Sequence, residues 1–273
     1  MHWSSRRRSR YAVAPPGVLP LRKLALLCVL LSSLSTPSRA EEAACFVENG
    51  VPVVSASVAG VAGDYIFDTG EPVTRLHDTR AMGAGLAEGP QSADIVFAGL
   101  LWASVPITTG DLDARTAAFT TPIAGVLGAD LLRRVTIEIR LEPSCRIHID
   151  LPDQAKPWRG PGEPIGLDAA GRPLITAGVS DGSHAWRGLF VLSTGLEASI
   201  ALASDTVTAP YGLAGRLRAA SFQGRLLENL GAAVILPERF PEAVGAIGSP
   251  FLSSGEWQID FVRGELRRRL PSP

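Results

Sequence analysis

Lysine is nearly absent from this 273-residue sequence, in which Lys23 and Lys156 are the only two lysines. Arginine supplies the rest of the positive charge, and the 26 lysines and arginines are offset by 27 aspartates and glutamates. The formal net charge is therefore −1, without the excess of positive charge that nucleic-acid-binding domains carry. This balance argues against nucleic acid as a partner.

Motifs for metal and phosphate chemistry are also missing, and the sequence context does not support a serine nucleophile. His77, His148 and His184 have no glutamate or cysteine at the spacing of a zinc site. The one Gly-x-Ser-x-Gly match, Gly178-Val179-Ser180-Asp181-Gly182, falls at a turn signal between two strand-like segments, whereas the elbow of an α/β-hydrolase joins a strand to a helix. The sequence has no glycine-rich phosphate loop. We therefore expect a protein that works without a metal or another cofactor.

Hydrophobic runs long enough to cross a membrane are missing too, because the apolar run over residues 24–34 has only eleven residues. An arginine cluster over residues 6–10 precedes this run, and Ser38-Arg39-Ala40 follows it with small residues at the positions a signal peptidase needs. We predict a signal peptide over residues 1–40. The mature chain would then be exported, to the periplasm or the medium, and would have no membrane span.

Cysteine is scarce, with three residues in the whole sequence. Cys28 lies in the predicted signal peptide, which leaves Cys45 and Cys145 in the mature chain. Because an exported protein matures in an oxidising compartment, we expect these two cysteines to form a disulfide. The alternative is a pair of buried, unpaired thiols.

Glycine and proline are plentiful by contrast, with 28 and 21 residues, and this composition favours short strands joined by many turns. Asn49-Gly50, a strong hairpin signal, lies between strand-like segments over residues 45–47 and 51–58. Further hairpin-like pairs cover residues 93–108 and 135–150. The sequence therefore predicts a mainly β protein.

The second half of the mature chain repeats the first half in the same order. Two pairs of segments match at an offset of 125 residues, and two later pairs match at an offset of 120. The matched segments are 65–70 with 190–195, 97–102 with 222–227, 126–132 with 246–252, and 137–141 with 257–261. Four matches in one order indicate an internal duplication.

A proline- and glycine-rich stretch separates the two copies and is typical of a linker. We predict an N-terminal lobe over residues 41–152, a linker over 153–163 and a C-terminal lobe over 164–273.

One motif gives the duplication a chemical meaning. A strand-like segment ends in Asp68-Thr69-Gly70, and an apolar residue followed by glycine, Leu127-Gly128, comes later in the same copy. This combination resembles the aspartic peptidases of the retropepsin and pepsin type. The resemblance implies a bilobal fold of two tandem retropepsin-like β-barrel lobes with a peptide-binding cleft between them. The fused copy would replace the second subunit of a homodimer, so we expect a monomer with an internal pseudo-twofold axis.

The resemblance also assigns roles to individual residues. Asp68 matches one catalytic aspartate, whereas Ser193 stands where the second aspartate is expected. Position 71 departs from the family as well, because Glu71 replaces the usual alanine or serine. The remaining matches are the cross-linking threonines Thr69 and Thr194, the loop glycines Gly70 and Gly195, and the supporting pairs Leu127-Gly128 and Ile247-Gly248.

Ser193 leaves two hypotheses about function. In the family two carboxyl groups share one proton and activate a water, and a serine hydroxyl cannot replace a carboxyl in that exchange. The protein is either an exported aspartic-type endopeptidase that uses Asp68, with Glu71 or Glu197 as a candidate second carboxyl, or an inactive pseudoprotease. A pseudoprotease would bind extended peptides by strand addition without cutting them.

Overall fold

The structure is a computed structural model that describes residues 42–206, 215–222 and 224–269. The predicted signal peptide over residues 1–40, with Cys28, lies outside the described residues. Within the described residues, no helix has the length and apolar character needed to cross a membrane.

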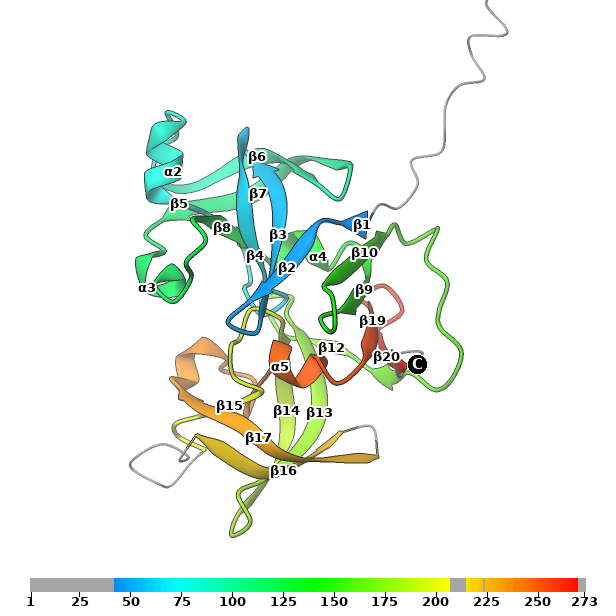
Figure 1. The fold of residues 1–273 in the computed structure, drawn as a ribbon. Helices are drawn as coiled ribbons and strands as arrows, with labels where there is room; N and C mark the ends of the chain where they lie inside the picture. The colour runs from blue at the N-terminus through cyan, green and yellow to red at the C-terminus, as the bar shows by residue number, and fades with distance from the viewer. Residues whose placement is uncertain (1–41, 207–214, 223, 270–273) are drawn as a thin grey trace, which may run out of the picture. The chain divides into compact units, whose positions relative to one another are not determined.

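The first half forms a closed barrel. Its seven-stranded sheet has the order β2-β3-β4-β8-β5-β7-β6, and an additional pairing of β3 with β6 closes six of these strands into a ring (Figure 1). The strands are β2 (Cys45–Glu48), β3 (Val51–Val58), β4 (Val61–Phe67), β5 (Thr74–His77), β6 (Gly89–Phe97), β7 (Leu100–Gly110) and β8 (Ile123–Leu127). Three short helices accompany them: α2 (Asp78–Gly83), α3 (Asp113–Thr116) and α4 (Ala129–Leu132).

The hairpin signal in the sequence explains how this barrel begins. Asn49 and Gly50 have φ angles of 51° and 77°, the left-handed conformation that a tight hairpin between β2 and β3 requires. Alternating residues of the strands then point inward, and Tyr65, Phe67 and Ile95 are fully buried. The burial of these large side chains stabilises the barrel.

The second half forms a barrel with the same strand order. Its sheet runs β12-β13-β14-β18-β15-β17-β16, and β13 also pairs with β16 to close the ring. The strands are β12 (Gly166–Leu167), β13 (Pro173–Ser180), β14 (Ala185–Ser193), β15 (Ile200–Ala203), β16 (Arg216–Phe222), β17 (Arg225–Ile235) and β18 (Gly245–Gly248). A 3-10 helix, η1 (Pro237–Arg239), and helix α5 (Ser249–Leu252) complete this half. The prediction of a mainly β fold with two barrel lobes is confirmed.

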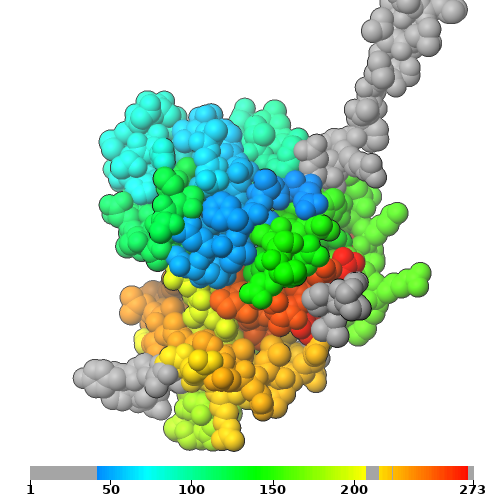
Figure 2. Space-filling view, in the orientation of Figure 1, coloured from blue at the N-terminus to red at the C-terminus, as the bar shows by residue number. Residues whose placement is uncertain are grey.

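A third sheet contains strands from both halves. Its order is β1-β10-β9-β19-β20-β11. The strands are β1 (Glu42–Ala43), β9 (Thr136–Arg140), β10 (Arg146–Asp150), β11 (Glu163–Pro164), β19 (Glu256–Asp260) and β20 (Glu265–Arg269). At its centre β9 pairs antiparallel with β19, which places Ile137 opposite Ile259. The space-filling view shows the green first-half residues against the orange and red second-half residues (Figure 2).

The lobe boundaries at residues 152 and 164 stay predictions. Glu163 and Pro164, at the junction of the predicted linker and second lobe, form β11 against β20.

A disulfide joins Cys45 of β2 to Cys145, in the turn between β9 and β10. The Cα atoms are 5.6 Å apart, a spacing that a disulfide commonly spans. The bond links the first barrel to the shared six-stranded sheet, in the pairing that the sequence led us to expect.

Candidate functional site

The Asp68-Thr69-Gly70 loop begins where β4 ends, and β8 supports it. β4 and β8 pair in parallel with Phe67 opposite Leu127, and the Asp68 amide donates to the Leu127 carbonyl at 3.1 Å. A Cβ atom on Gly128 would lie 2.7 Å from the backbone of Val73, so only glycine fits there. The apolar-glycine pair of the sequence therefore acts as a close-packed support for this loop.

The Ser193-Thr194-Gly195 loop is built in the same way. β14 and β18 pair in parallel, with Leu192 opposite Ile247 and Ser193 opposite Gly248. A Cβ atom on Gly248 would lie 2.1 Å from the Ala198 carbonyl oxygen, which again requires glycine. Both loops are therefore positioned by equivalent strands of the two barrels.

The two threonines hold the loops together through reciprocal hydrogen bonds. The Thr69 hydroxyl donates to the Leu192 carbonyl at 2.5 Å and accepts from the Thr194 amide at 3.2 Å. The Thr194 hydroxyl donates to the Phe67 carbonyl at 2.7 Å and accepts from the Thr69 amide at 3.0 Å. All of these groups are buried. The four bonds fix Asp68 and Ser193 against each other.

The Asp68 carboxylate is buried, with 1% of the residue exposed, and donors satisfy both of its oxygens. Oδ1 accepts from the Ser193 hydroxyl at 2.8 Å, the Gly70 amide at 2.8 Å and the Gly195 amide at 3.0 Å. Oδ2 accepts from Arg115 Nη2 at 3.1 Å. The structure thus brings together Asp68 and Ser193, and it adds an arginine that the sequence reasoning missed.

Both loop glycines are needed for this close approach. A Cβ atom on Gly70 would lie 2.4 Å from the Ser193 hydroxyl oxygen. A Cβ atom on Gly195 would lie 2.3 Å from Asp68 Oδ2 and 2.5 Å from Arg115 Nη2. Any larger residue would push the two loops apart.

Arg115 reaches the site from α3, in the segment between β7 and β8. Besides Asp68, its Nη2 donates to the Gly195 carbonyl at 2.6 Å, so this one side chain bridges the two loops. Its Nε is buried and has no partner in the part of the chain that the structure describes. The buried Leu112 and the bond from the Thr116 hydroxyl to the Leu112 carbonyl anchor the short helix.

Of the two glutamates that the sequence offers as a second carboxyl, Glu71 is electrostatically coupled to Asp68. Burial raises the pKa of Glu71, the negative charge of Asp68 raises it further, and the positive charges of Arg75, Arg115 and Arg239 oppose the rise. Glu197 is exposed. Of the two residues, Glu71 is therefore the one whose surroundings favour the protonated carboxyl.

An open cleft of about 570 Å³ adjoins the site. Both halves line it, with Arg115 from the first barrel and residues 196–199, 231–233, Arg239 and Pro250 among those from the second. Its volume lies within the range of small-ligand sites, roughly 300–1,000 Å³. The cleft adjoins the Asp68 loop through Arg115, which lines it and is bonded to Asp68.

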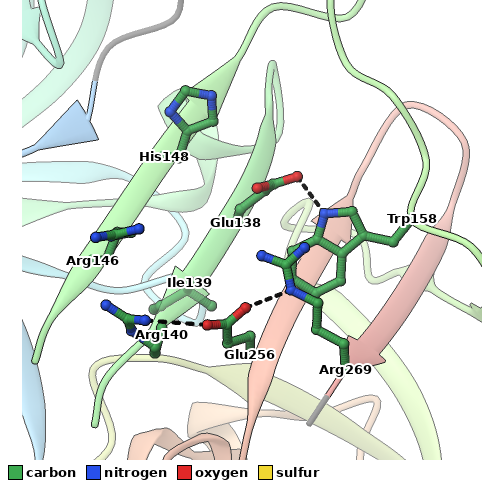
Figure 3. A pocket seen from close by; sticks show the side chains of 8 residues that line it. All are labelled: Glu138, Ile139, Arg140, Arg146, His148, Trp158, Glu256 and Arg269. Carbon is green, nitrogen blue, oxygen red and sulfur yellow. Dashed lines mark hydrogen bonds and ion pairs between the residues drawn. The ribbon is translucent and has the colours of Figure 1, made fainter. Parts of the chain in front are cut away.

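A second pocket, on the shared six-stranded sheet, is much smaller at about 40 Å³ (Figure 3). Three of its charged side chains form ion pairs with one another, since Glu256 lies 3.3 Å from Arg140 and 2.5 Å from Arg269. Glu138 accepts from the Trp158 indole at 2.5 Å. Among the described residues no group of three histidine, cysteine or acidic side chains could hold a metal ion. These observations favour the cleft as the candidate site.

Comparison with known proteins supports the fold and goes no further. No family model matches the sequence, and no curated protein matches it. Among solved structures, the fold is similar to the crystal structure of an aspartic proteinase from Irpex lacteus, with a TM-score of 0.52. The alignment covers 86% of this chain and 98% of the other, at 12% sequence identity. The described chain therefore has the two-barrel fold of an aspartic proteinase.

Proposed function

We propose that the protein is an exported, monomeric peptide-binding protein built on the aspartic-proteinase fold. An extended peptide occupies the cleft beside Asp68, and cleavage is absent or slow. The observation that carries the proposal is the state of the Asp68 carboxylate, whose Oδ1 is hydrogen-bonded to Ser193 and whose Oδ2 is paired with Arg115.

The chemistry of the family explains why this state opposes cleavage. Two facing carboxyl groups share a proton, so that one can act as a base toward water and the other as an acid toward the substrate. Ser193 supplies only a neutral donor, and Arg115 occupies the oxygen of Asp68 that is left free. Loss of one acid–base partner typically costs about 10²- to 10⁴-fold in rate.

The same geometry supports retention of binding. The reciprocal threonine bonds and the tight glycine contacts hold the two barrels in one arrangement. A rigid cleft can bind an extended segment with little further ordering of the protein. The N-terminal sequence supports export.

A second candidate function is an endopeptidase that uses Asp68 with Glu71. The observation in its favour is the raised pKa of Glu71, caused by burial and by the charge of Asp68. A buried carboxyl whose surroundings favour the protonated form can serve as a general acid. In this case protonated Glu71 would supply the acid that Ser193 cannot.

One set of variants separates the two functions. The exported chain and its Asp68→Asn, Glu71→Gln and Ser193→Asp variants would be incubated with an unfolded protein between pH 3 and 7, and the fragments counted by mass spectrometry. Glu197→Gln tests the other candidate carboxyl, which is exposed and lines the cleft. The binding proposal expects no turnover above background in the unmodified protein. If the unmodified protein cuts the substrate, if Asp68→Asn and Glu71→Gln each abolish the cutting, and if Glu197→Gln does not, the protein is the endopeptidase instead.

Binding itself is tested with a random peptide-display library. The unmodified protein should enrich a family of sequences, and Ala232→Trp, which places a large ring on the cleft lining, should not. Equal recovery of the library by both proteins would overturn the proposal.

A further inference from the structure

Arg239 lines the cleft without a carboxylate partner among the described residues. It lines the same space as Arg115, but it is exposed, and no carboxylate among the described residues lies within ion-pair distance of its guanidinium. Arg115, by contrast, is committed to Asp68 and to the Gly195 carbonyl. The cleft is therefore lined by one arginine that is paired with Asp68 and by one that has no carboxylate partner among the described residues.

The surroundings of Arg239 hold it in place. Its guanidinium lies 5.5 Å from the centre of the buried Phe240 ring, and Arg172 lies 5.0 Å from the same ring. The Arg239 carbonyl accepts a bond from Arg172 Nη1 at 2.6 Å. Arg172 is in turn fixed by the buried Asp168, with 2.5 Å between Nε and Oδ2. A cation supported in this way loses less side-chain freedom when it binds an anion.

The lining near Arg239 leaves room for a ligand side chain. Ala198, Gly231, Ala232 and Ala233 are all small, so the open volume is bounded by backbone and methyl groups. The positive charge of Arg239 acts on the loop that carries Asp68, because it lowers the pKa of Glu71, which follows Gly70 in that loop. A ligand lying along the loop would therefore pass within the field of this guanidinium.

We infer that Arg239 binds a carboxylate of the peptide ligand, so that the cleft selects peptides with an acidic group beside η1. The acidic group is either an aspartate or glutamate side chain or a free C-terminal carboxylate, since an arginine fork recognises both. The inference rests on the proposed peptide binding and holds whether or not the bound peptide is cut. Glu197, which lines the same cleft, opposes this preference by charge repulsion.

The test uses a peptide enriched from the display library and three synthetic relatives. One relative has its acidic residues replaced by amides, one has its C-terminus amidated, and one has both changes. Dissociation constants would be measured by fluorescence anisotropy for the unmodified protein and for Arg239→Gln. Removing the recognised carboxylate should weaken binding about 10- to 100-fold, the usual worth of a hydrogen bond to a charged group. The relative that shows the loss identifies the source of the carboxylate.

Variants of the protein then locate the effect. Arg239→Gln should abolish the difference between the acidic peptide and its amide relative, and Arg239→Lys should keep part of it. Glu197→Gln should tighten binding of the acidic peptide. Arg218→Gln, which removes an exposed arginine that does not line the cleft, is the matched control and should change nothing. A discrimination that survives Arg239→Gln, or cleft binding without discrimination, overturns the inference alone. Absence of any peptide binding overturns the proposed function as well.

Discussion

The hydroxyl of Thr194 should be among the most important polar groups for the stability of this protein. Thr194→Val keeps the shape of the side chain but removes Oγ1, which donates to the Phe67 carbonyl at 2.7 Å and accepts from the Thr69 amide at 3.0 Å. Both backbone groups are buried and would lose their partners. An unsatisfied buried group costs about 1–3 kcal/mol, so the loss of two partners should lower the free energy of unfolding by about 2–6 kcal/mol. That is a large fraction of the roughly 5–15 kcal/mol that stabilises a typical domain.

The assay is equilibrium unfolding in urea, followed by tryptophan fluorescence. Thr176→Val is the matched control, because Thr176 is an exposed strand residue in β13, and it should change stability by less than about 0.5 kcal/mol. Thr69→Val should resemble Thr194→Val, and the double variant should lose less than the sum because one broken pair already loosens the other. A loss for Thr194→Val no larger than that of the control would refute the proposed role of the reciprocal bonds.

Three further predictions concern single features. Glu71→Gln should be more stable than the unmodified protein at neutral pH and equal to it below about pH 4. Because the pKa of Glu71 is raised in the folded state, the stability of the unmodified protein falls as the pH rises through that folded-state pKa. Thermal melts that show the same difference between the two proteins at every pH would contradict this. Thr74→Val should cost about 1–3 kcal/mol in urea unfolding, since the Thr74 hydroxyl donates to Asp130 Oδ1 and accepts from the Gly128 amide. Replacing both Cys45 and Cys145 by alanine removes a crosslink that spans 100 residues, so the free energy of unfolding should fall by about 4 kcal/mol relative to the oxidised parent protein. The reduced parent protein should lose a similar amount, and urea unfolding of all three forms would measure both losses.

The sequence predicted the centre of the site because that part depends on short-range patterns. A strand that ends in Asp68-Thr69-Gly70 and its copy 125 residues later are recognisable from local order alone. The structure places the Ser193 hydroxyl 2.8 Å from Asp68, so the two matched loops do meet. The positions at which glycine is required are also local, since each reflects the close approach of one backbone to another.

Arg115 and the shared sheet could not be predicted in this way. Residues 113–116 form a single short turn of helix, and nothing in their order separates an arginine that reaches a buried carboxylate from one in solvent. The sequence shows that residues 136–140 and 256–260 form strands, but it does not show that these two strands pair with each other. Strand pairing depends on which surfaces are left to pack after each barrel closes, and that is a property of the whole chain.

The hydroxyl at position 193 gives the two loops a contact unlike one between two carboxyl groups. Two carboxylates in contact repel unless they share a proton, and an aspartic peptidase tolerates that strain because catalysis uses it. In this protein the Ser193 hydroxyl donates to Asp68, and Arg115 supplies a positive charge on the other oxygen. The contact between the loops is therefore attractive without a shared proton. This attraction adds to the reciprocal threonine bonds, so the two loops stay together whether or not the centre carries out catalysis. The proposed peptide binding requires only that the cleft stays intact.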